Sequence, residues 1–128
     1  MSVLKGGNAM SLTIPRFSSN AALRSASENK VPLRQGASGE GVAILQQALI
    51  DLGFDMPNST HQRTTLPDGI FGSETTLTVK SFQRKNGLSA DGIVGRQTLD
   101  TLQRLIIAAA EAAQIQFVVN FSQTGLIA

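Results

Sequence analysis

An eight-residue pattern occurs twice in this chain, 23 residues apart, and it constrains the fold more than any other feature. Its copies are residues 68–75 (DGIFGSET) and 91–98 (DGIVGRQT). In each copy the Asp-Gly pair suits a tight turn, because Gly accepts a positive φ and the Asp side chain can bind nearby amides. We expect the next residue, Ile, to enter the core, the second Gly to lead into a helix, and the Thr to lie in that helix's first turn. The pattern therefore predicts one structural device used twice, each time before a helix.

Apolar residues recur at helical spacing in three segments, which predicts three amphipathic helices. The stripes are Val42, Leu45, Leu49 and Leu52; Thr75, Val79 and Phe82; and Leu99, Leu102 and either Leu105 or Ile106. Gly53 and Gly87, each followed by an apolar residue, are typical of a left-handed helix stop. Ser38 is the expected N-cap of the first helix. We expect Phe71, Val79 and Phe82 in the core of an all-α domain.

The composition removes several classes of function. A chain of 128 residues with 41% hydrophobic residues forms one globular domain with a core of its own. It has no cysteine, which excludes disulfides, thiolate metal sites and thiol nucleophiles. The single histidine, His61, is expected in an exposed loop and cannot assemble the usual zinc or iron sites. The sequence predicts no cofactor, no metal and no membrane span.

Catalysis and nucleic-acid binding are not expected either. Glu40 and Glu74 are the candidate carboxylate pair for glycoside hydrolysis, but their flanks supply no apolar pocket and both suit a helix start. Six Phe without Trp or Tyr disfavour stacking on sugar rings. Residues 1–35 carry five basic side chains and one acid, spread out without interleaved aromatic residues. That spacing is not typical of a nucleic-acid site.

Residues 33–106 resemble a known family. The residues that carry the resemblance are Leu33-Arg34-Gln35-Gly36, Gly41-Val42, Leu45-Gln46, Leu49, Leu52-Gly53-Phe54, both DGI-containing turns, Thr75, Val79, Phe82-Gln83, Gly87-Leu88, Thr98 and Leu102. Together they resemble the peptidoglycan-binding domain of the three-helix type. The resemblance implies a compact, non-catalytic module, usually attached to cell-wall hydrolases, that binds the glycan strand or the stem peptide of peptidoglycan. The link over residues 55–67 is longer and more polar than the short connection expected in that family.

Five residues are the candidate ligand contacts: Asp68, Arg84, Asn86, Asp91 and Arg96. The two Asp residues also have a structural explanation in their turns. Arg84 and Asn86 end the second predicted helix, where cations suit the negative end of the helix dipole. There they would flank the second repeat, and they or Arg96 could meet a stem-peptide carboxylate.

The chain is expected to have three regions. Residues 1–32 form an extended arm with one short helix near 21–28, residues 33–106 form the three-helix domain, and residues 107–128 form a docking tail. Alternation within 115–121 (IQFVVNF) predicts a short β-strand at the end of a helical extension. A lone strand would pair with the protein's own Leu12–Phe17 arm, a partner protein or a symmetry mate, and disorder of the tail is the remaining alternative. The candidate partner contacts are Leu12, Ile14, Phe17, Ile115, Phe117, Val119 and Phe121.

A narrower resemblance rests on Arg16-Phe17-Ser18, the phrase LIDLGF at 49–54 and the two repeats. These features are similar to peptidoglycan-binding-domain proteins encoded with phage-tail-like contractile injection particles. The first 16 residues lack the apolar run and cleavage pattern of a signal peptide, so we expect synthesis in the bacterial cytoplasm. The resemblance implies release by lysis within a particle. Two functions therefore stay open: non-enzymatic recognition or anchoring at peptidoglycan, and an adaptor subunit held by its terminal arms.

Overall fold

The computed structural model describes residues 12–60 and 66–123, with side chains up to residue 112. The elements in chain order are α1 (Pro15–Ser18), α2 (Ala21–Ser27), α3 (Glu40–Asp51), the 3₁₀ helix η2 (Pro57–Ser59), α4 (Ser73–Lys85) and α5 (Arg96–Gln123). In the described residues, extended chain pairs only at isolated bridges, such as the one between Leu33 and Val94. The predicted all-α class is therefore confirmed.

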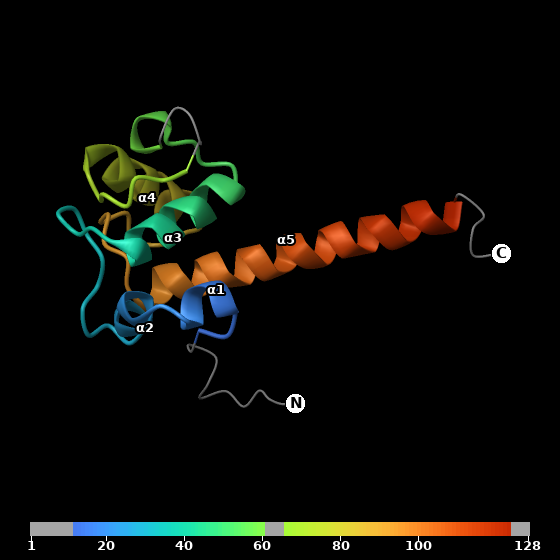
Figure 1. Ribbon diagram of the computed structural model, residues 1–128, viewed down its shortest axis with the longest axis horizontal. Coiled ribbons are helices and arrows are strands. Elements are labelled where there is room, and N and C mark those ends of the chain that lie inside the picture. Colours follow the sequence, from blue (N-terminus) through green and yellow to red (C-terminus); the bar gives the residue numbers. More distant parts are fainter. Residues whose placement is uncertain (1–11, 61–65, 124–128) are drawn as a thin grey trace.

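The body is built from α3, α4 and the first turns of α5, with α2 packed below them (Figure 1). α3 contacts both α4 and α5, and α2 contacts both α3 and α5. The rest of α5 leaves this body as a long rod along the molecule's longest axis (Figure 1). The three predicted stripes correspond to the buried faces of α3, α4 and the start of α5.

The core is one cluster that draws on every part of the body. Its members are Phe17, Leu23, Ala26, Leu33, Val42, Leu45, Ala48, Leu49, Met56, Phe71, Val79, Phe82, Val94, Leu99 and Leu102. Phe71, Val79 and Phe82 are thus core residues, as predicted. The ring of Phe54 packs edge-on against that of Phe82, with their centroids 5.7 Å apart.

The amino-terminal segment is not an extended arm over residues 12–32. The short helix expected near 21–28 is α2, and Asn20 caps it by accepting the Leu23 N–H at 3.0 Å. Phe17, on α1, is completely buried, and Leu12 and Ile14 pack partly buried against the same core. Phe17, which the sequence assigns to a partner interface, instead fills the protein's own core. The partner roles of Leu12 and Ile14, which keep some exposed surface, stay predictions.

Both predicted glycine stops are confirmed, and the predicted cap is wrong. Gly53 has φ 96° and Gly87 has φ 73°. In each case the next N–H reaches back to a carbonyl five residues earlier, as in a left-handed helix stop. Ser38 does not cap α3: Gly39 is the N-cap, and the Ser38 backbone forms an antiparallel bridge with Ile70. Ser38 therefore pairs with the first repeat, just before the helix begins.

The strand predicted at 115–121 is also wrong. The backbone of Ile115, Phe117, Val119 and Phe121 lies within α5, which continues to Gln123. Ala-rich sequence just before this segment favours helix, and the helix continues through the alternating run. The side chains of these four residues lie outside the described part of the structure. Among the described helices, none has the length and apolarity that a membrane crossing requires.

Candidate functional site

A buried glutamine organises the first copy of the repeated turn. The amide nitrogen of Gln46 donates to the Ile70 carbonyl at 3.0 Å and to the Thr75 hydroxyl at 3.0 Å. The same nitrogen lies 3.3 Å from Oδ1 of Asp68. Its amide oxygen accepts the Gly69 N–H at 2.9 Å. One side chain from α3 therefore holds the turn and the start of α4 together.

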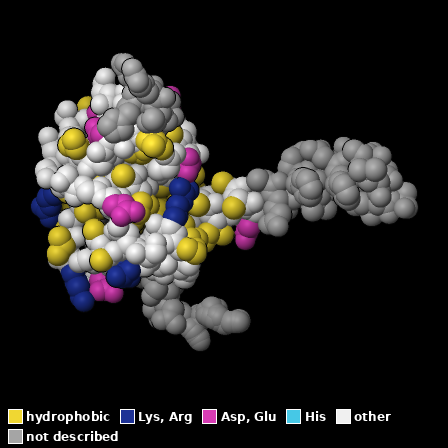
Figure 2. Space-filling view, viewed as in Figure 1, with side chains coloured by type: hydrophobic (Ala, Val, Ile, Leu, Met, Phe, Trp, Pro, Cys, Tyr) yellow, Lys and Arg dark blue, Asp and Glu magenta, His cyan; other side chains and the backbone are white. Residues whose placement is uncertain are grey.

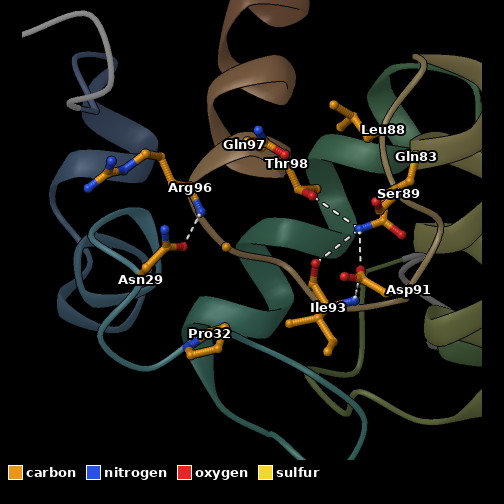
Figure 3. A pocket seen from close by; sticks show the side chains of 11 residues that line it. Asn29, Pro32, Gln83, Leu88, Ser89, Asp91, Ile93, Arg96, Gln97 and Thr98 are labelled. Atoms are coloured by element: carbon orange, nitrogen blue, oxygen red, sulfur yellow. Dashed lines mark hydrogen bonds between the residues drawn. The ribbon is translucent and has the colours of Figure 1, made fainter.

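Gln83, on α4, does the same for the second copy. Its amide nitrogen donates to the Ile93 carbonyl at 3.0 Å and to the Thr98 hydroxyl at 3.1 Å. It also lies 3.1 Å from Oδ1 of Asp91, and its amide oxygen accepts the Gly92 N–H at 2.9 Å. Figure 3 shows this amide at the centre of the second turn. The device predicted from the repeat is thus a turn locked by a glutamine from the preceding helix.

The turns confirm one detail of the prediction and correct another. Gly69 and Gly92 have positive φ angles, and each Asp accepts the N–H two residues later at 2.9 Å. The Ile side chains do not enter the core: Ile70 is 57% exposed. Because each Ile carbonyl accepts from the glutamine, the following residue, Phe71 or Val94, fills the core instead.

A groove of about 530 Å³ opens beside the second turn (Figure 3). It is lined by Asn29, Pro32, Gln83, Leu88, Ser89, Asp91, Ile93, Gly95, Arg96, Gln97 and Thr98. One side comes from the link between α4 and α5 and from the start of α5, and the other from the chain after α2. Asn29 joins the two sides, because its Oδ1 accepts the Arg96 N–H at 2.9 Å.

The structure divides the candidate ligand contacts into two groups. Asp91 and Arg96 line the groove. The Arg96 side chain extends toward α2, where its Nε lies 3.4 Å from the Ser27 carbonyl, and it points away from Asp91 (Figure 3). Asp68 belongs to the first turn. Arg84 and Asn86 lie outside the groove at the end of α4, and their ligand roles stay predictions.

Sequence reasoning missed three polar residues of the groove: Asn29, Ser89 and Gln97. Asn29 is separated from its partner Arg96 by 67 residues, so no local pattern indicates their contact. The repeat could have pointed to Gln97, because this residue occupies the position in the second copy that Glu74 occupies in the first.

The long link between α3 and α4 packs over the first turn. The Ser59 carbonyl accepts the Asp68 N–H at 2.7 Å. The backbone N–H and side-chain amide of Asn58 both donate to Oε2 of Glu74, at 3.2 Å each. Met56 is 2% exposed and belongs to the core. His61 lies outside the described residues.

The described residues offer no grouping typical of a metal centre. They contain no cluster of three or more His, Asp or Glu side chains placed to hold a metal ion. Glu40 is exposed in the first turn of α3, whereas Glu74 is held by Asn58. Lys and Arg side chains are scattered over the face shown in Figure 2 and do not gather in one patch.

Comparison with known proteins assigns the body to a family. Residues 38–102, which include both turns and both glutamines, match the family model "Putative peptidoglycan binding domain". The chain belongs to the peptidoglycan-binding-domain family. The matched segment is a binding domain. A solved structure of a peptidoglycan-binding protein from Clostridioides difficile, in complex with glutamine hydroxamate, superposes with a TM-score of 0.50 at 43% identity, over 59% of this chain and 42% of that one.

Two curated relatives place the same domain in larger proteins. The N-acetylmuramoyl-L-alanine amidase CwlL of Bacillus licheniformis is 36% identical over 86 residues, which are 67% of this chain and 22% of the amidase. The type VI secretion system spike protein VgrG3 of Vibrio cholerae is 35% identical over 85 residues, covering 58% of this chain and 8% of the spike protein. The chain therefore spans less than a quarter of the length of either relative.

Proposed function

We propose that this protein binds peptidoglycan without cleaving it, and that the ligand occupies the groove beside the second turn. The observation that supports this most is the position of the groove within the segment that matches the binding-domain family. Its volume of about 530 Å³ falls in the range of small-ligand sites, roughly 300–1,000 Å³. Asp91 and Arg96 both line it, and residues of opposite charge suit the charged groups of a stem peptide.

A sedimentation assay with purified bacterial sacculi tests this proposal. The full chain is expected to sediment with the wall saturably. Arg96→Ala is expected to weaken binding about tenfold, the usual loss when a hydrogen bond to a charged group is removed. Arg84→Ala is the matched control, because Arg84 is also an exposed arginine but lies outside the groove.

Two results would overturn the proposal in different ways. If the unmodified chain does not sediment, the proposal that it binds peptidoglycan is wrong. A loss with Arg84→Ala, combined with no loss for Arg96→Ala, would move the ligand from the groove to the end of α4.

A second candidate function is that of an adaptor subunit in a contractile injection particle. Two observations favour it: the projecting part of α5, and the similarity to a secretion-system spike protein. Hydrophobic side chains gather where α5 leaves the body (Figure 2). Within α5, Leu105 is 37% exposed, and Ile106 and Ile107 are partly buried. On this hypothesis the protein is made in the bacterial cytoplasm and reaches the wall with a particle released by lysis.

Truncation distinguishes the two functions. A variant lacking residues 107–128 should keep its full affinity for sacculi if the groove carries the function. If the protein is an adaptor, the full chain should copurify with particles from lysed cells and the truncated variant should not.

A further inference from the structure

The two eight-residue copies correspond position by position, but the links that lead into them differ in length. Phe54 and Leu88 follow the glycine stops of α3 and α4, and Asp68 and Asp91 begin the two turns. Thirteen residues separate Phe54 from Asp68, whereas two separate Leu88 from Asp91. The first copy therefore carries an insertion at the place where the second copy has its open groove.

The inserted segment contacts two polar groups of the first copy through the backbone of two consecutive residues, Asn58 and Ser59. The N–H of Asn58 donates to the Glu74 carboxylate, and the carbonyl of Ser59 accepts from the Asp68 N–H. Met56, just before them, is buried in the core. A short peptide is thus bound across the turn and the first turn of α4 by one acceptor, one donor and an apolar anchor.

The second copy has an equivalent donor and acceptor, and no segment of the described residues is hydrogen-bonded to them. The counterpart of Glu74 is Gln97, which is exposed, lines the groove and carries a side-chain oxygen that can accept an N–H. The counterpart donor is the N–H of Asp91, for which the described residues supply no acceptor. Leu88 and Ile93 add apolar surface to the groove lining.

We infer that the groove binds the stem peptide of peptidoglycan, rather than its glycan strand, in the way the first copy binds residues 56–59. The ligand donates a backbone N–H to Gln97 and accepts from the Asp91 N–H with the carbonyl of its next residue. A donor and an acceptor on consecutive residues are a property of a peptide backbone. This inference rests on the proposed function and specifies which part of the wall is recognised.

An NMR titration of the ¹⁵N-labelled full chain tests the inference, with two probes used separately. A soluble stem pentapeptide is expected to shift the Asp91 amide signal saturably, and peptide-free glycan strands are expected to leave it unchanged.

Gln97→Ala should weaken peptide binding about fivefold, the loss expected for one hydrogen bond. Gln97→Glu, which restores the acceptor found at Glu74, should recover at least half of that loss in free energy. Ser81→Ala, at an exposed α4 position outside the groove, should bind like the unmodified chain.

Sedimentation with sacculi on the same samples separates the failures. If the protein sediments but the free peptide leaves the Asp91 amide unshifted, or if glycan strands shift it, the stem-peptide inference is wrong and the proposed function stands. If the protein does not sediment, the proposed function is overturned and the inference with it.

Discussion

The side-chain amides of Gln46 and Gln83 hold two copies of one turn through equivalent hydrogen bonds, whose lengths agree within 0.2 Å. Each amide donates to a carbonyl and a hydroxyl while it accepts a glycine N–H. A glutamate in its ionised form has no N–H to donate. The helix glutamine and the Asp-Gly turn therefore form one structural unit, held together by the glutamine's side-chain amide.

Removing the amide of Gln83 should be costly. We expect Gln83→Met to lower the free energy of unfolding by about 2–4 kcal/mol, because buried groups of Gly92, Ile93 and Thr98 lose their partner. Urea denaturation measures the loss. Gln97→Met, at an exposed groove position, should change it by less than about 0.5 kcal/mol. Equal losses in the two variants would contradict the role assigned to Gln83.

The glycines of the two turns should differ in their tolerance of alanine. Both have positive φ, but a Cβ at Gly69 would lie 3.0 Å from the Gly39 carbonyl oxygen, whereas one at Gly92 would meet the flexible side chains of Thr76 and Lys80. We expect Gly92→Ala to cost about 1–2 kcal/mol from the backbone conformation alone, and Gly69→Ala to cost more. Gly72→Ala is the control, because its φ is negative and an added Cβ would have no atom within 4 Å apart from the adjoining residues. Thermal unfolding followed by circular dichroism would rank the three variants.

The amino-terminal helices should be part of the folding unit, although they precede the family segment. Phe17→Ala is expected to lower the free energy of unfolding by about 3–5 kcal/mol, because it leaves a cavity in the core. Its neighbour Arg16 forms a partly exposed ion pair with Asp51 at 2.8 Å. Arg16→Ala should therefore cost less than about 1 kcal/mol. If Phe17→Ala unfolds at the same denaturant concentration as the unmodified chain, the segment is not integral to the body.

Asn29 should affect both stability and the groove. Its side chain accepts the Arg96 N–H near the start of α5, so Asn29→Ala should cost about 1 kcal/mol, as loss of a helix cap does. Asn29→Asp keeps the acceptor and should retain most of that stability. Because Asn29 also lines the groove, Asn29→Ala should weaken binding to sacculi. Unchanged stability and binding in Asn29→Ala would show that the bridge between the two sides has no role.

The sequence predicted the parts of the fold that local patterns encode. Stripes at helical spacing located the buried faces of α3, α4 and the start of α5, and the glycine stops and Asp-Gly turns followed from backbone conformation. The roles of Gln46 and Gln83 were not predicted, although both residues were noted, because their four bonds depend on how each helix packs against the next turn. The groove was missed for the same reason: Asn29 reaches it from 67 residues away.

Two errors arose where one pattern fits two structures. Leu12, Ile14 and Phe17 resembled anchors of an extended arm, but Pro15 at the first position of α1 allows a short helix that buries Phe17. The alternation at 115–121 has the period of a strand, yet the segment continues a helix that is already formed. Once a helix exists, adding a residue costs less than starting a new element.

The start of α5 has a mechanical consequence. Its first two residues, Arg96 and Gln97, line the groove, and the same helix continues without a break to Gln123. At 1.5 Å per residue this rod is about 42 Å long. If the groove binds its proposed ligand, a load attached near Gln123 would be transmitted to the rim of the groove by this single helix, with no loop in between to absorb it.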